Sequence, residues 1–382
     1  MYINLPKMNF DVFNNIRIFL MYKYTDMMHK TPYFVNAQII NLSNKLDLTR
    51  KNYSIYNLFN LESFIDQVAV KYNTNNTKLY QTIHHKFYYF YCEFLHHQIF
   101  NMLFLNNKTY SILCMTNHDK NIPFKHILDT LYPTSTFKES CYFQNNFSEI
   151  SIINNFIQYC NAFTNAYHFI IIDLDIKAQS RFSMEELILL YFCYLVNILS
   201  SNGSCIIRLP FPKTMLCKRI TLELLCFIGN CFQHVVLLNP LCSKHFEPEF
   251  YLLCRNFQKT FYRAKYMNLS LSLFQNIIYK PEGKNVYSFL NFTIPLFYQC
   301  KLNDLLNQFL YEYIECLQQI YNYHIHFDKN KLDLQCKKRV LRAKHWINSY
   351  SVIHKHGNNS LQKQEIQQLL HDIVNVIELC YD

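Results

Sequence analysis

Two charged residues lie where apolar segments of strand length come to an end. Asp173 closes the run that begins at Tyr167, and Arg208 lies near the end of the run from Ser204 to Leu209. The carboxyl ends of parallel strands meet at one edge of a sheet, so we expect both side chains there. A guanidinium keeps its proton at any working pH. Arg208 could therefore bind phosphate or stabilise an alkoxide, but it could not act as a base.

The segments around these two residues alternate between strand and helix. Ser183 and Glu186 predict a capping box that begins a helix reaching about Ser200, and residues 201–203 are expected to end it. Nearly uninterrupted apolar strands are typical of a mostly parallel sheet with helices on both faces. The sequence thus predicts an α/β, Rossmann-like domain over residues 79–258. Its expected strands are residues 110–115, 167–173, 204–209, 234–238 and 249–254, with a second helix over 213–230.

The flanking regions lack this alternation. Residues 1–78 mix short apolar stretches with polar residues and end in an Asn/Thr-rich segment, so we expect an N-terminal extension of mainly helical structure. Residues 259–382 are predicted to form a C-terminal helical region, with helices over 302–323 and 361–381. The densest basic run of the chain lies between them, at residues 337–344.

Composition excludes several classes of protein. Half of the 382 residues are hydrophobic and 17% are charged, which argues against a disordered chain. The longest apolar run, residues 187–199, is too short to span a bilayer, and the N-terminus lacks the apolar stretch of a signal peptide. The 15 cysteines show no CxxC pair and are interpreted as reduced core residues of a cytoplasmic protein without membrane contact.

Charge favours an acidic partner, whereas histidine spacing argues against a metal. A formal net charge of +10 makes nucleic acid the first partner to consider. The adjacent histidines at 84–85 and 96–97 and the spaced His324 and His326 supply no tetrahedral ligand set, so no metal site is expected.

Three segments of the chain carry a resemblance to a known family. Residues 167–173, YHFIIID, end in Asp173; residues 202–208, NGSCIIR, end in Arg208; and residues 239–251, NPLCSKHFEPEFY, contain Glu249 and Tyr251. In this order and at these separations they resemble the FtsJ family of RNA ribose 2′-O-methyltransferases. The flanking regions make the layout similar to the cap-modifying, viral-type branch of that family. The resemblance covers roughly half the chain and implies a Rossmann-like methyltransferase fold with a sheet of the seven-stranded type.

The resemblance implies a catalytic tetrad of Lys, Asp, Lys and Glu. Asp173 and Glu249 match their positions, Arg208 stands where the family has its central lysine, and Lys86 lies one turn from the position of the first lysine. The family lysine helps to deprotonate or steer the ribose hydroxyl, which Arg208 could do only by steering.

The resemblance also implies sites for S-adenosylmethionine and RNA. The cofactor loop corresponds to residues 115–123, where Met115, Thr116 and Asn117 are the candidate contacts, but it contains no glycine to let a ligand approach the backbone. The candidate RNA contacts are Ser243, Lys244, Lys337, Lys338 and Arg339.

Three functional hypotheses follow from these observations. The first is an RNA-binding, FtsJ-like protein with degenerate catalytic and cofactor sites and no bound cofactor. The second is an active, divergent S-adenosylmethionine-dependent 2′-O-methyltransferase that acts on the cap of mRNA. The third is an interaction protein that keeps only the fold. RNA, including capped mRNA, and a protein partner subunit are the expected partners.

Overall fold

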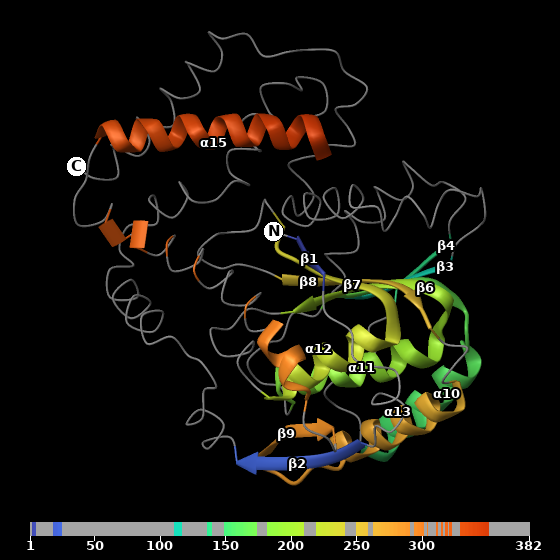
Figure 1. Ribbon diagram of the computed structural model, residues 1–382. Coiled ribbons are helices and arrows are strands. Elements are labelled where there is room, and N and C mark those ends of the chain that lie inside the picture. Colours follow the sequence, from blue (N-terminus) through green and yellow to red (C-terminus); the bar gives the residue numbers. More distant parts are fainter. Residues whose placement is uncertain are drawn as a thin grey trace.

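The computed structural model describes eleven continuous segments of the chain and some single positions between 304 and 322. The segments are residues 2–4, 18–24, 111–116, 136–139, 149–173, 182–209, 219–240, 250–258, 263–290, 294–301 and 329–350. They form a mixed α/β structure in which a twisted sheet lies against a layer of helices (Figure 1).

Seven strands form the main sheet, in the spatial order β1-β7-β8-β6-β5-β3-β4. Neighbours from β4 to β6 run parallel, whereas β8 is antiparallel to both β6 and β7, and β1 is antiparallel to β7. The strands are β1 (Tyr2–Asn4), β3 (Ser111–Thr116), β4 (Thr136–Glu139), β5 (Tyr167–Asp173), β6 (Leu199–Leu209), β7 (Phe232–Leu238) and β8 (Phe250–Phe257). The five strands expected from the sequence are β3, β5, β6, β7 and β8, so the predicted α/β domain is confirmed in its main elements.

Both faces of this sheet are shielded from solvent. On β5, Ile170 and Ile172 belong to one hydrophobic core together with residues of the helices, while Ile171 between them is fully buried on the other face. Side chains alternate between the faces of a strand, so Asp173 shares the face of Ile171. By the same alternation Arg208 shares the face of Ile206, which is also buried. A sheet that is apolar on both faces is the expected property of parallel strands.

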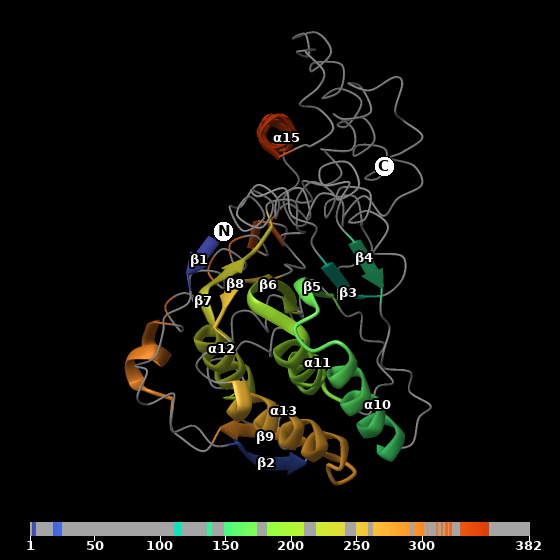
Figure 2. The ribbon, with the colours of Figure 1, turned by 90° about the vertical axis from the view of Figure 1, so that its right-hand side faces the viewer.

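Three helices cover the face of Ile170 and Ile172. They are α10 (Glu149–Ala162), α11 (Met184–Ile198) and α12 (Arg219–Cys231), and both views place them on the same side of the sheet (Figure 2). Aromatic packing ties α10 to α11, because the Phe156 ring meets Tyr194 edge-on at 4.6 Å. The Phe156 ring also stacks at 4.0 Å on Phe274, which lies on the helix over 263–278. The predicted capping box of α11 is confirmed: the Ser183 hydroxyl accepts from the Glu186 amide, and the Ser183 amide donates to the Glu186 carboxylate.

A second layer lies outside these helices. It consists of α13 (Arg263–Ile278) and a two-stranded antiparallel sheet of β2 (Ile18–Tyr24) and β9 (Lys284–Leu290). The Asn197 amide on α11 donates to the Ser270 hydroxyl on α13, and Phe274 and Phe289 belong to the same core as the main sheet. Described residues of the C-terminal flank therefore build one core with the α/β domain, and β2 of the N-terminal flank pairs with β9.

The flanking regions match the expected helical extensions only in part, since residues 259–382 contain helices over 263–278 and 329–350. The described parts of residues 1–78 are strands, and β9 is a strand within the region expected to be helical. Two strands pair with segments that are distant in the sequence: β1 lies beside β7, and β2 lies beside β9. Local pattern could not reveal these pairings, because long-range contacts override intrinsic preference. The expected helix over 361–381 lies outside the described residues.

The end of α11 also differs from expectation. The helix stops at Ile198, and β6 begins at Leu199, so residues 201–203 lie within that strand rather than at a helix end. Asn202 adopts a left-handed φ of 62°, a conformation that asparagine tolerates better than most residues. A Cβ on Gly203 would come within 2.9 Å of the Ser200 carbonyl oxygen, so glycine is required for this bend.

The last described helix, α15 (Lys329–Tyr350), lies on the opposite side of the main sheet from α10 to α13 (Figures 1 and 2). It contains the whole basic run at 337–344. Within the described part of the chain, no helix combines the length and apolar character needed to cross a membrane.

Candidate functional site at the carboxyl edge of the sheet

Asp173 and Arg208 meet at the carboxyl edge of the sheet, as the sequence predicted. The Arg208 Nη1 donates to Asp173 Oδ1 at 3.0 Å, and the side chains are 15% and 1% exposed. β5 and β6 are parallel neighbours, which places the ends of the two strands side by side. The pair is therefore a nearly buried ion pair whose arginine keeps some contact with solvent.

The neighbouring strands place this pair at the topological switch point of the sheet. After β3 the chain forms β4 on one side and then crosses to β5 on the other, and Asp173 pairs in register with Thr116 at the end of β3. Open α/β sheets bind ligands in the crevice outside the strand ends at this point. On its other side Arg208 pairs with Tyr251 of β8, and both side chains face away from α10 to α12.

The structure describes only part of the expected tetrad and cofactor site. Lys86, Asn117, Ser243, Lys244 and Glu249 lie outside the described residues. Phe250, the sequence neighbour of Glu249, pairs with Leu209 beside Arg208.

The described end of β3 does not fit a cofactor-binding role for Met115. Its side chain is 1% exposed and belongs to the core on the helix side, the face opposite Asp173. The side chain of Met115 therefore packs in the core and does not face the side of the sheet that carries Asp173. The stretch from 115 to 123 also lacks glycine. These two observations differ from the glycine-rich cofactor loop that the resemblance implies, so we assign no step to S-adenosylmethionine.

The basic run is divided between the two faces of α15. Lys337 and Lys338 are exposed, whereas Arg339 is 7% exposed and shares the buried face with Trp346. Arg339 therefore lacks the exposure that was expected of a phosphate contact, because helical residues adjacent in sequence point in different directions. Among the described residues, no group of three or more potential metal ligands comes together.

A second cluster of buried charge lies in the helix layer, around Glu186. Besides its role in the capping box, the carboxylate accepts from the Lys280 ammonium and, at 2.7 Å, from the backbone amide of Val286 in β9. The Lys280 ammonium also donates to the Asn285 side chain at 3.0 Å. Glu186 and Lys280 are both buried, and this ion pair joins the start of α11 to the turn between α13 and β9.

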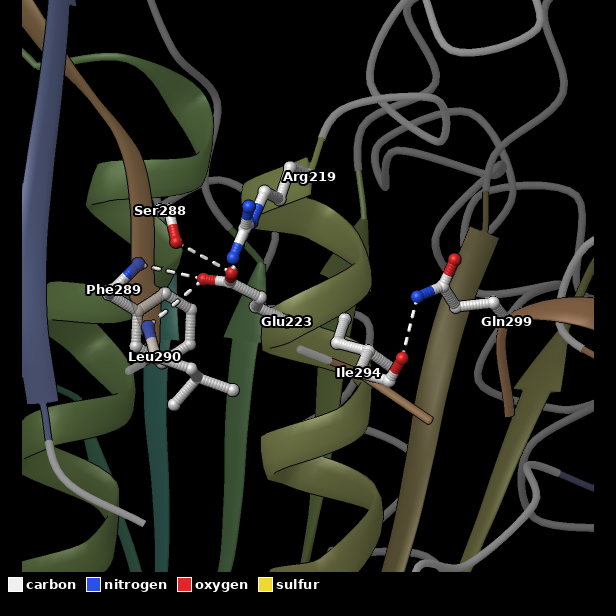
Figure 3. Close-up of polar contacts among 7 residues, drawn as sticks. All are labelled: Arg219, Glu223, Ser288, Phe289, Leu290, Ile294 and Gln299. Carbon is white, nitrogen blue, oxygen red and sulfur yellow. Dashed lines mark hydrogen bonds and ion pairs between the residues drawn. The ribbon is translucent and has the colours of Figure 1, made fainter. Parts of the chain in front are cut away.

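Glu223 of α12 binds the other end of β9 (Figure 3). One carboxylate oxygen accepts from Phe289 and Leu290 backbone amides at 2.7 and 3.1 Å, and the other accepts from the Ser288 hydroxyl at 2.6 Å and Arg219 Nε at 2.8 Å. The Glu223 side chain is fully buried. Burial, and secondarily this carboxylate, raise the pKa of the nearby Cys226 thiol to about 12.

The two glutamates brace the helices that follow the site strands. α11 follows β5, which ends in Asp173, and α12 follows β6, which carries Arg208. β9 is hydrogen-bonded to a glutamate within the first two turns of each helix. Sequence reasoning identified Glu186 only as a cap and missed Glu223. The signal for Glu223 was a single carboxylate within the apolar stretch of a helix, since such a residue is buried only when its oxygens are hydrogen-bonded.

Comparisons with known proteins do not identify a family for this chain. No protein-family model matches the chain, and no curated protein matches it. Among solved structures, it is similar to the crystal structure of human methyltransferase-like protein 13 in complex with SAH, with 13% sequence identity over 49% of this chain and 93% of that chain. The TM-score is 0.30, and a likeness at this level carries no argument. The functional proposals therefore depend on topology and on the Asp173–Arg208 pair.

Proposed function

We propose that this chain is an RNA-binding protein with an FtsJ-like methyltransferase fold and a catalytic site that no longer supplies a base. The observation that supports it best is the ion pair between Asp173 and Arg208 at the switch point of the sheet. The FtsJ-like motifs assign these two positions to a catalytic aspartate and lysine. An arginine there retains the positive charge but cannot accept the proton of a ribose hydroxyl.

The chemistry of the pair suits an anionic ligand. A guanidinium presents five N–H donors in a rigid plane and matches phosphate oxygens. In the structure one of its nitrogens engages Asp173, and the side chain keeps partial access to solvent. The ligand proposed for this edge is the sugar–phosphate backbone of RNA, which Arg208 contacts while Asp173 fixes the orientation of the guanidinium.

Two titrations test this proposal. Calorimetry of the full chain with S-adenosylmethionine and S-adenosylhomocysteine is expected to show no binding. Fluorescence anisotropy with a labelled single-stranded RNA is expected to show binding that weakens as salt rises, because contacts with phosphates release counterions. Arg208→Gln should weaken RNA binding by roughly tenfold, within the range for loss of a charged contact.

Arg255→Gln provides a matched control. Arg255 lies on β8, which runs antiparallel to β6, at the end of the strand remote from Arg208. The substitution therefore removes an arginine from the same sheet but not from the candidate site. This variant should bind RNA like the wild type. Equal RNA affinity of the two variants would contradict a role for Arg208.

The active methyltransferase is the competing proposal. This proposal requires cofactor binding. Micromolar affinity for S-adenosylmethionine would reject the hypothesis of a degenerate site and would mean that the loop at 115–123 holds the cofactor without glycine. In that case Lys86, Asp173, Arg208 and Glu249 become the residues to substitute in a methyl-transfer assay. Absence of both cofactor and RNA binding, in protein shown to be folded, would leave the fold as an interaction scaffold.

A further inference from the structure

The outward face of α15, which is not part of the site at the sheet edge, carries exposed leucines among basic residues. Leu334 and Leu341 are 53% and 63% exposed, although both are large apolar side chains. They are seven residues apart, so they lie on the same side of the helix about 10.5 Å from each other. Lys338 and His345 continue the same stripe, at spacings of three or four residues, and both are exposed.

Positive charge flanks this stripe on both sides. Lys337 and Lys344 lie along one flank, and Arg342 extends the other flank beyond Lys338. The one acidic residue in the sequence of α15, Asp333, is half-buried and lies away from the centre of the stripe. The inward face is apolar and already packed, with Cys336, Val340, Ala343 and Trp346 buried.

We propose that the outward face of α15 binds an acidic protein partner, at a surface where an apolar groove is bordered by carboxylates on both sides. The leucines would fill the groove, and the flanking lysines and arginine would pair with its rims. This inference goes beyond the proposed function, because it concerns a face of α15 and not the sheet edge.

The pattern fits a protein better than it fits RNA or a membrane. Single-stranded RNA is bound by basic grooves with aromatic rings for the bases, whereas this stripe offers leucine. The major groove of A-form RNA is too deep and narrow for side chains to read from a helix laid across it. A helix lying in a bilayer interface needs a broad apolar face, and two leucines among four cations are too few. Exposed leucine ringed by charge is instead the arrangement of helix-in-groove recognition.

The probe for this surface is a labelled helical peptide about three heptads long, with leucine on one face and glutamate on both flanks. Anisotropy with the full chain is expected to show binding. The double variant Leu334→Ala with Leu341→Ala should bind roughly tenfold more weakly, because the peptide then buries less apolar surface. Lys337→Glu with Lys344→Glu should weaken binding further by placing like charges opposite each other.

Three controls make the result decisive. Leu296→Ala removes a leucine that is 74% exposed outside α15, and its affinity for the peptide should equal that of the wild type. A peptide with lysine in place of glutamate should not bind. The emission of Trp346, on the inward face of α15, should be the same in all variants if the helix remains packed.

Two outcomes overturn the proposal. One is that the acidic peptide does not bind, or binds equally to the double leucine variant. The other is that a polyuridine oligonucleotide or vesicles of anionic lipid bind through the lysines of this face while the acidic peptide does not. Because Arg208→Gln leaves α15 unchanged, it should not alter peptide binding, which separates this test from that of the edge site.

Discussion

Replacing Glu223 by glutamine should destabilise the protein measurably, although the two side chains have nearly the same shape. The buried carboxylate accepts four hydrogen bonds: two from backbone amides of Phe289 and Leu290, one from Ser288 and one from Arg219. Glutamine offers one carbonyl oxygen and turns an NH2 group toward the remaining donors. The substitution thus removes charge from every contact and places donor against donor.

The expected loss can be worked out contact by contact. A hydrogen bond to a charged group contributes about 1.5–3 kcal/mol, against about 0.5–1.5 for a neutral one, so each of the two amide contacts loses roughly 1 kcal/mol. The Ser288 hydroxyl can rotate to accept from the new NH2 group, which limits its cost. The Arg219 side chain is 34% exposed, so solvent replaces much of that contact. Glu223→Gln should therefore cost about 2–3 kcal/mol, and Glu223→Ala about 3–5 kcal/mol, because it leaves the amides without their acceptor.

Urea unfolding followed by circular dichroism measures this change. A loss of 2–3 kcal/mol corresponds to a midpoint lower by roughly 1 M. Glu282→Gln is the matched control, since Glu282 is exposed in the turn just before β9, and its change should stay within about 0.5 kcal/mol. If Glu223→Gln unfolds at the same urea concentration as Glu282→Gln, then the hydrogen bonds between Glu223 and β9 do not stabilise the fold.

Further predictions concern other buried groups. Lys280→Met should lower the free energy of unfolding by about 3 kcal/mol, because the buried Glu186 carboxylate loses its cation; thermal unfolding would show a lower midpoint. In folded protein at pH 8, iodoacetamide should label the exposed Cys300 well before the buried Cys226, whose pKa is about 12, as peptide mass spectrometry can measure. The folded state holds the Cys226 proton more tightly than the unfolded state, so this contribution to stability is present below pH 9 and is lost as pH rises toward 12; urea midpoints at increasing pH should fall. Trp346 is the sole tryptophan and is buried, so its emission should be blue-shifted and weakly quenched by acrylamide until unfolding exposes it.

The fold was predictable where a segment's own pattern determines its structure. The run that ends in Asp173 is mostly apolar and forms a strand buried on both faces, as its composition predicts. Ser183 and Glu186 carry the local signal for a helix start and form it. The expected helix end at residues 201–203 was wrong because the sequence gives a turn signal at Asn202 and Gly203 whether the bend lies in a helix end or in a strand.

Contacts between segments distant in the sequence could not be predicted from it. β9 owes its place to Glu186 and Glu223, which precede it by about a hundred and by 66 residues respectively, and no periodicity encodes such a contact. Likewise, the basic run at 337–344 gave no indication that Arg339 would be buried while Lys338 remained exposed. The meeting of Asp173 and Arg208 was predictable, because parallel topology brings strand ends together without any knowledge of side-chain packing.

The ion pairs Lys280–Glu186 and Arg208–Asp173 have opposite relations to solvent, and this difference supports the role proposed for Arg208. Lys280 and Glu186 are 3% and 0% exposed, and their remaining hydrogen bonds go to the protein's own backbone and side chains. Arg208 is 15% exposed and lies at a sheet edge where ligands bind. A buried ion pair gains little stability over an apolar pair of equal volume, so stability alone does not explain a charge pair at this edge. An arginine that is oriented by a buried carboxylate and still reaches solvent is arranged to meet an anion, and this arrangement favours phosphate binding over proton transfer at the site.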